Sequence, residues 1–192
     1  IHETFLSYVW CISYSLLVLY DENVAKISQN QVEGKPVHVI DLPKIEKAKE
    51  LFNYAKSLIV VFSEWDKNEL PNPELYTVDD KFYIERANGL FVYAMNFILC
   101  HEFAHVEKEH TNRLLAGPGT KSHILAFEKE ADERAIELIL LGTNDVTKAS
   151  THFGILIGLC SFLFFKGTVA NETHPDTDDR ITTFVEKIDP PP

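Results

Sequence analysis

The chain has 192 residues, of which 45% are hydrophobic and 11% aromatic, and this composition excludes a disordered protein. Its 29 acidic and 18 basic residues leave a formal charge of −11. We therefore expect no nucleic-acid partner, because binding to phosphate backbones needs clustered lysine and arginine. The length fits one domain over residues 1–192, and we expect it to belong to a longer chain because Ile1 stands where a methionine would begin one.

The three cysteines, Cys11, Cys100 and Cys160, each lie in an apolar run. An odd, sparse set without paired spacing argues against a disulfide framework and favours a reducing compartment. We therefore expect three buried thiols and a cytoplasmic location.

Residues 4–20 carry no charge and predict a helix that ends near Asp21. The segment is close to the length that spans a bilayer, but it contains several serine, threonine and tyrosine residues. We favour a core helix over a membrane helix.

The next part of the chain predicts a helix between two short strands. Residues 37–40, Val-His-Val-Ile, are typical of a strand, and Asp41, Leu42 and Pro43 then mark the start of a helix with apolar spacing as far as residue 55. The run 58–62 is rich in valine and isoleucine and predicts a buried strand. The long polar stretch 63–80 is expected to be a loop that shapes a cleft.

Helical patterns dominate the second half. The first covers about residues 84–110, with Gly89 as an expected break, and residues 116–120, Ala-Gly-Pro-Gly-Thr, separate it from a second helix over about 122–141. Gly142 is a good terminator for that second helix.

A third helix is expected over about residues 147–165. Its core, residues 149–165, is uncharged and contains Gly154 and Gly158, a spacing that allows close helix approach. We again favour a buried core helix over a membrane span. A polar loop over 166–179 and a short final helix from about Asp179 complete the chain.

The motif His101-Glu102-Phe103-Ala104-His105 carries the clearest chemistry. Residues four apart lie about one helical turn from each other, so both imidazoles project from one face and can reach one Zn²⁺. Glu102 lies about 100° further round the helix, where a carboxylate can act as general base toward a water on the metal. Apolar neighbours indicate a buried helix, in which two histidines need partners for their nitrogens.

A catalytic zinc needs a third protein ligand. The metzincin pattern is excluded, because Lys108 and Thr111 stand where it needs a glycine and a histidine. A Glu-x-x-x-Asp pattern on the following helix fits instead: Glu128 is the expected ligand, and Asp132 is expected to orient a ligand histidine. Glu130 is a rival ligand, but it points away when Glu128 faces inward, and a solvated surface position is expected for it.

The segment 173–181, Thr-His-Pro-Asp-Thr-Asp-Asp-Arg-Ile, contains two candidates for stabilising an oxyanion, His174 and Arg180. From the residues alone, an ordinary turn followed by a helix start explains the segment equally well. Tyr76 and Tyr83 are reserve candidates for the oxyanion donor.

Together these motifs resemble the gluzincin metallopeptidases related to the CaaX prenyl endopeptidases and HtpX-type proteases. The resemblance implies His101, His105 and Glu128 as zinc ligands, Glu102 as base and His174 near the transition state. His110 also matches the pattern of these families without being a ligand in them. The aromatic opening of the chain, residues 8–20, is similar to that of the Lit peptidase family, phage-exclusion enzymes that cleave a host translation factor.

These features predict an α+β fold: a mainly helical, zincin-like domain in which the His-Glu-x-x-His helix packs on the glutamate helix and a small sheet from residues 37–62 roofs the cleft. The expected function is a zinc-dependent endopeptidase with a protein or peptide substrate, acting as a cytoplasmic phage-defence effector, with a regulatory partner or the rest of a longer chain controlling it. Two alternatives stay open: a membrane-associated zinc protease and a non-catalytic zinc-binding interaction module.

Overall fold

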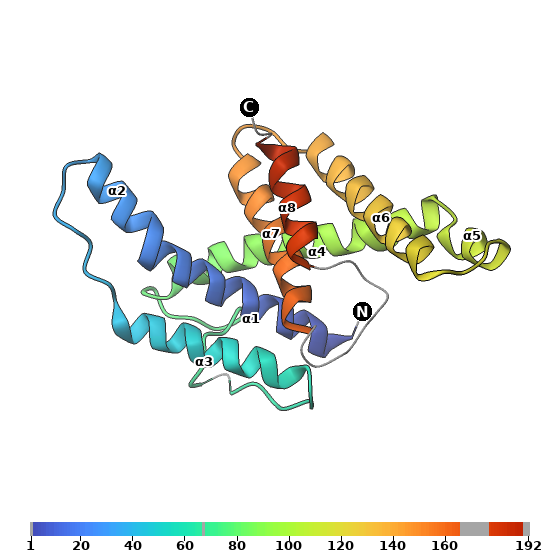
Figure 1. The fold of residues 1–192 in the computed structure, drawn as a ribbon. Helices are drawn as coiled ribbons and strands as arrows, with labels where there is room; N and C mark the ends of the chain where they lie inside the picture. Colours follow the sequence, from blue (N-terminus) through green and yellow to red (C-terminus); the bar gives the residue numbers. More distant parts are fainter. Residues whose placement is uncertain (1, 67, 166–176, 190–192) are drawn as a thin grey trace. The chain divides into compact units, whose positions relative to one another are not determined.

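The computed structural model describes residues 2–66, 68–165 and 177–189 (Figure 1). Within these ranges the chain is helical and contains no strand, so the predicted α+β class is wrong, although the expectation of a mainly helical protein is correct. The small sheet expected from residues 37–62 does not form, and among the residues that the structure describes no sheet covers a cleft.

Both runs that predicted strands have exposed valines and form no sheet. Val37 and Val39 are 80% and 85% exposed in an extended connection, and the helix expected to end near residue 55 instead continues to Leu58. A turn follows this helix, and Val60 and Val61 are exposed on it. The preference of valine and isoleucine for strands depends on packing against neighbouring strands, and neither run has such a neighbour in the described part of the chain.

The chain gathers into two compact units, Ile1–Phe91 and Val92–Pro192. Helix α4 (Lys81–Glu107) begins in the first unit and ends in the second, and it runs without interruption through Gly89, where a break was expected. The two units are described separately below.

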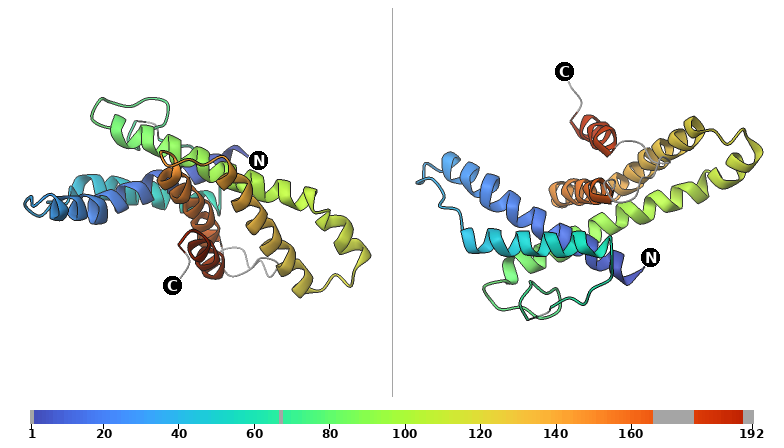
Figure 2. Two further views of the ribbon diagram at one scale, coloured as in Figure 1. Left: turned by 90° about the horizontal axis from the view of Figure 1, so that it is seen from above. Right: turned by 60° about the horizontal axis from the view of Figure 1, so that its bottom comes forward.

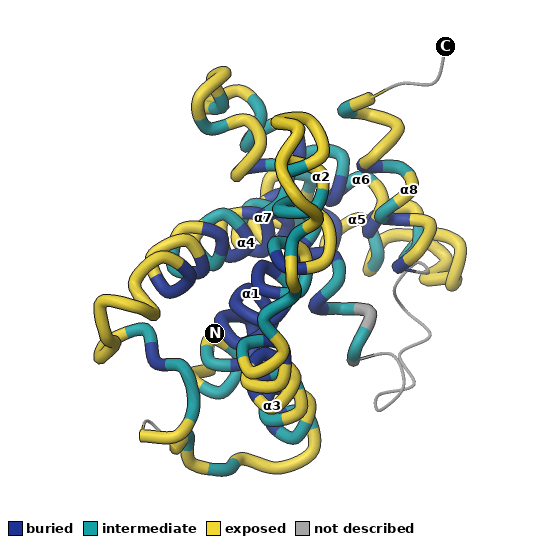
Figure 3. Tube along the Cα trace, turned by 90° about the vertical axis from the view of Figure 1, so that its left-hand side faces the viewer, coloured by how far each residue is buried: buried dark blue, intermediate teal, exposed yellow. Residues whose placement is uncertain are grey.

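In the first unit, α1 (Glu3–Tyr20), a π-helical turn η1 (Asp21–Ala25) and α2 (Lys26–Val32) follow one another as a continuous rod, and α3 (Leu42–Leu58) packs along α1 (Figure 1). Most of α1 is buried (Figure 3), as expected for a core helix. Helix α3 starts as predicted: the side chain of Asp41 accepts a hydrogen bond from the Lys44 backbone N–H at 3.1 Å, which satisfies a free donor of the first turn.

The second unit contains the end of α4, α5 (His110–Ala116), α6 (Lys121–Leu141), α7 (Lys148–Phe165) and α8 (Thr177–Ile188). Figure 2 shows that the chain turns through α5 and that α6 then runs in the direction opposite to the end of α4. The bounds of α6, α7 and α8 agree with the predicted helices to within about two residues.

Helix α7 approaches α4 closely through two glycines. A Cβ atom on Gly154 would collide with Tyr93, and one on Gly158 would lie 3.0 Å from a ring carbon of Phe97. Residues 166–176, which include His174, lie outside the described ranges.

By length and composition alone, two helical segments among the described residues could cross a membrane, Glu3–Val32 and Lys81–Glu107. Core helices of soluble proteins pass the same test, and 56% of the apolar window of the first segment is buried within the structure.

Candidate metal centre

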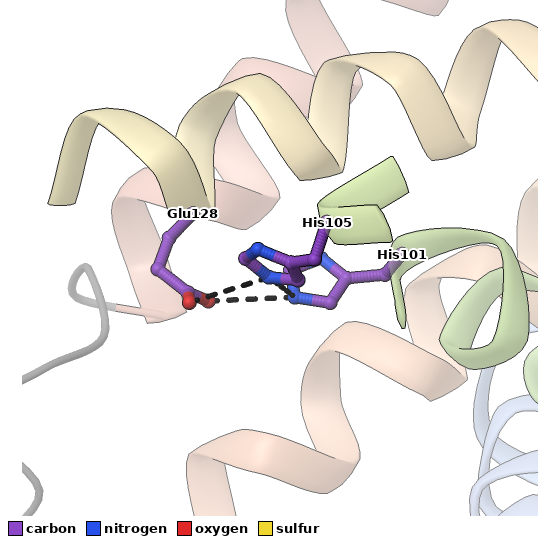
Figure 4. Close-up of side chains that lie close together, drawn as sticks. All are labelled: His101, His105 and Glu128. Carbon is purple, nitrogen blue, oxygen red and sulfur yellow. Dashed lines mark hydrogen bonds and ion pairs between the residues drawn. The ribbon is translucent and has the colours of Figure 1, made fainter. Parts of the chain in front are cut away.

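Three side chains from two helices of the second unit point toward one another (Figure 4). His101 and His105 come from one face of α4, and Glu128 comes from α6. His101 and Glu128 are buried, with 4% and 7% of their surface exposed, and His105 is half-buried. The structure therefore brings together the three residues that the sequence predicts as metal ligands.

The distances between the three groups fit a tetrahedral ion. His101 Nε2 and His105 Nε2 lie 3.0 Å apart, and each lies 3.4 Å from a carboxylate oxygen of Glu128. Ligand atoms about 2.0–2.1 Å from a tetrahedral Zn²⁺ are separated from one another by about 3.3 Å. The observed separations are close to this value, and the donor set of two imidazoles and a carboxylate with an open fourth position is one that catalytic zinc uses.

The second ring nitrogen of His101 is held by a buried ion pair. His101 Nδ1 lies 2.9 Å from Asp132 Oδ1, and Arg180 donates to both oxygens of Asp132 at 2.6 Å. Because the Asp132 carboxylate can only accept, His101 donates from Nδ1 and keeps Nε2 for the centre. Burial alone would raise the pKa of Asp132, but His101 and Arg180 hold it below its usual value, so the carboxylate is ionised.

The two histidines titrate differently in the metal-free chain. Burial opposes the charged form of His101, but the hydrogen bonds to Asp132 and Glu128 outweigh burial and raise its pKa to about 9. Burial, and then the charge on His101, lower the pKa of His105 below its usual range. One proton therefore has to leave His101 before both Nε2 atoms can bind a metal ion.

Glu102 is exposed to solvent, next to His101 on α4. It lies about 100° round the helix from His101, so it does not join the ligand set but borders the same side of the helix. This position is compatible with a carboxylate that handles protons of a water or substrate.

The candidates for the oxyanion donor lie in different places in the structure. Arg180 is buried, and its guanidinium pairs with Asp132 and lies over the Phe162 ring. Tyr83 belongs to the first unit, where its hydroxyl lies 2.5 Å from Asp21 and 2.9 Å from Glu22. Tyr76 is exposed, also in the first unit. The catalytic role expected for His174 stays a prediction, because His174 lies outside the described residues.

Near the centre lie His110 and Arg113, which had no assigned role in the sequence analysis, and Glu130, which was expected at a solvated position. His110 is buried, with its Nδ1 2.8 Å from Nδ1 of His105 and its Nε2 3.2 Å from Glu130 Oε2. Arg113 donates to the same Glu130 oxygen at 2.9 Å. Glu130 is therefore not simply a solvated residue as expected. In the sequence, only the match of His110 to the pattern of the resembling families could have drawn attention to it. The structure, in which the chain turns between α4 and α5, shows what His110 contacts.

A His-Glu-x-x-His motif on one helix whose histidines meet a glutamate of a second helix is the kind of site that metallopeptidases contain. The chain belongs to the Peptidase U49 family, whose model matches residues 1–192. It is therefore a peptidase by family. No curated protein and no solved structure matched the chain.

Proposed function

We propose that this peptidase is a zinc-dependent endopeptidase in which His101, His105 and Glu128 hold the metal and Glu102 is the general base. The observation that carries the proposal is the convergence of two imidazole nitrogens and a carboxylate at 3.0–3.4 Å from one another. These separations match the edges of a zinc coordination tetrahedron, at about 3.3 Å.

A zinc ion in this place would polarise the peptide carbonyl and bring the pKa of a water toward neutrality. Glu102 would take a proton from the attacking water and pass it to the leaving amine. Asp132 would hold the ring of His101 so that Nε2 faces the centre, and Arg180 would keep Asp132 ionised and in place.

A pocket of about 250 Å³ lies in the second unit beside the Asp132–Arg180 pair that backs His101. Asp132 and Arg180 form part of its wall, and Leu125, Ile136 and Leu159 supply apolar surface. The three candidate ligands and Glu102 do not line this pocket, so the support for a peptide or protein substrate comes from the peptidase family.

The membership in Peptidase U49 and the resemblance to the Lit peptidases support a role as a phage-defence effector that cleaves a protein. The cysteines Cys11, Cys100 and Cys160 are free thiols, which supports action in the reducing cytoplasm. A membrane-associated protease is the second candidate, because the helix Lys81–Glu107, which contains the motif, is apolar enough to cross a bilayer. Full recovery of the expressed chain in a detergent-free extract would argue against the second candidate.

The metal assignment is tested by the zinc content of the purified chain. We expect one zinc per chain in the wild type and a loss of affinity of more than about 100-fold in Glu128→Ala, because losing a direct ligand weakens binding more than losing a residue behind it. Glu137→Ala, on the exposed side of the same helix, is the matched control and should keep zinc. Equal zinc binding by Glu128→Ala and the wild type would show that the third ligand lies elsewhere.

A further inference from the structure

The two histidines of the candidate centre differ in what holds their second nitrogen. His101 is backed by a carboxylate, Asp132, and then by an arginine. His105 is backed by another histidine, His110, then by Glu130 and then by Arg113. None of His110, Glu130 and Arg113 takes part in the contacts among the three candidate ligands themselves.

The hydrogen-bonding capacities of these groups determine which atom donates at each step from His105 through His110 to Glu130. The Glu130 carboxylate only accepts, so the proton of the His110 ring is on Nε2, and Nδ1 of the neutral ring is an acceptor. His105 Nδ1 lies 2.8 Å from this acceptor and therefore donates to it. With its proton on Nδ1, His105 presents a lone pair on Nε2, the atom that faces His101 and Glu128.

His110 is fixed in this orientation by packing as well as by hydrogen bonds. It is 4% exposed, and its ring stacks on Phe127 with a centroid distance of 4.5 Å and an interplanar angle of 10°. The guanidinium of Arg113 lies 4.5 Å over the same Phe127 ring while it donates to Glu130. A buried, stacked imidazole with both nitrogens engaged has little rotational freedom.

The backbone takes an unusual conformation to place His110 there. Glu109 adopts a left-handed conformation with φ 53°, between the end of α4 and the start of α5. On a continuous helix, residue 110 would lie about 140° round the axis from His105 and would not face its ring. The turn at Glu109 redirects the chain, and such conformations outside glycine are uncommon and concentrate at functional sites.

We infer that His110, supported by Glu130 and Arg113, is a positioning residue that holds His105 in the tautomer and orientation required for metal binding. The inference rests on the proposed zinc site and adds to it. His110 is not a further ligand, because it contacts Nδ1 of His105, the nitrogen that points away from the centre.

The test compares three variants for affinity for zinc alone, measured by competition with a chromogenic chelator. We expect His110→Ala to bind zinc about 10–100-fold more weakly than the wild type, the usual effect of removing a group that orients a ligand. His110→Asn should recover most of this loss, because its amide oxygen can accept from His105 Nδ1. His123→Ala, an exposed histidine on α6, is the matched control and should bind as the wild type does.

The visible spectrum of bound Co²⁺ separates positioning from ligation, because it reports the coordination number of the ion. His110→Asn should keep the band intensity of the wild type. A changed coordination number would make His110 a ligand and overturn the inference. Unchanged zinc affinity in His110→Ala would overturn it as well, while leaving the proposed function intact. Absence of zinc binding by the wild type would instead refute the proposed function. If His110→Ala fails to fold, Glu130→Ala and His110→Asn decide the question by the same two measurements.

Discussion

Two clusters of buried charged and polar side chains, one in each unit, differ in how their acceptors are satisfied. In the first unit, Glu22 is 0% exposed and is surrounded by donors: the Lys26 ammonium, the His38 ring at 2.7 Å and the Asp41 backbone N–H at 3.1 Å. In the second unit, the imidazole nitrogens of His101 and His105 and the carboxylate of Glu128 face one another at a common point.

The comparison shows that burial of charge does not by itself mark a functional site. Burial would raise the pKa of Glu22, but the surrounding donors lower it to about 2, so the carboxylate is ionised and complete without an ion. Lys26 belongs to α2, His38 and Asp41 to the connection that follows it, and the Tyr83 hydroxyl of α4 also donates to Glu22 at 2.9 Å, so this cluster joins segments of the first unit. The cluster in the second unit brings together atoms of the kind that bind metals, and other residues hold both imidazole rings from behind, which is the arrangement expected of a metal site.

The largest effect is expected for the general base. Glu102→Gln should retain stoichiometric zinc but lose about 10²–10⁴-fold in cleavage rate, because the amide cannot accept the proton. Comparison of the proteomes of cells that express the wild type and Glu102→Gln would identify the cleaved protein, and purified substrate would then give the rate. Cleavage at the wild-type rate by the variant would assign the base to another residue.

The comparison breaks if the Glu22 cluster contributes to the metal centre. Glu22→Gln should lower the free energy of unfolding by roughly 3 kcal/mol, since it removes the charged partner of a buried pair, and should leave zinc affinity unchanged. Denaturant unfolding and chelator competition measure the two quantities. Because the pKa of Glu22 is lower in the folded chain than in the unfolded chain, its contribution is complete above the ordinary carboxyl pKa and is lost as the pH falls toward about 2. The variant should lack this acid-sensitive part of the stability.

The pH dependence of zinc binding sharpens the description of the second cluster. Since the pKa of His101 is about 9 in the metal-free chain, zinc has to displace one proton at neutral pH. Affinity should therefore rise about tenfold per pH unit between about pH 6.5 and about pH 8. In Asp132→Asn this slope should be smaller, because the variant lacks the carboxylate that stabilises the imidazolium. A pH-independent affinity in the wild type would show that zinc binding displaces no proton from His101.

The smallest effect is expected at the turn that places His110. Glu109→Gly should keep zinc affinity and raise the free energy of unfolding by up to about 1 kcal/mol, because glycine adopts φ 53° without steric cost. Glu109→Val should have the opposite effect on stability and should weaken zinc binding several-fold, since a β-branched residue resists this conformation. Thermal unfolding of the metal-free variants, followed by zinc titration, measures both effects. Equal behaviour of the two variants would show that the turn does not depend on this conformation.

The amino-acid sequence alone predicted most of the long helices and the three residues that meet at the candidate metal centre. Apolar residues at helical spacing, together with Asp41 at one start and Gly142 at one end, place several helix boundaries through local interactions. The spacing of His101 and His105 within one turn also determines locally that both rings share a face. The membership of the chain in a peptidase family agrees with what this motif predicts.

Only the tertiary structure decided the conformation of the valine-rich runs and the contacts of His110 and Glu130 behind the candidate ligand His105. Val37 and Val61 are of a residue type common in strands, but that preference depends on packing against a neighbouring strand, and the described chain supplies none to them. The contacts from His105 to His110 and on to Glu130 depend on a left-handed turn and on α6 packing beside α5. Such contacts join residues that are distant in the sequence or displaced by a backbone turn, and local patterns do not determine them.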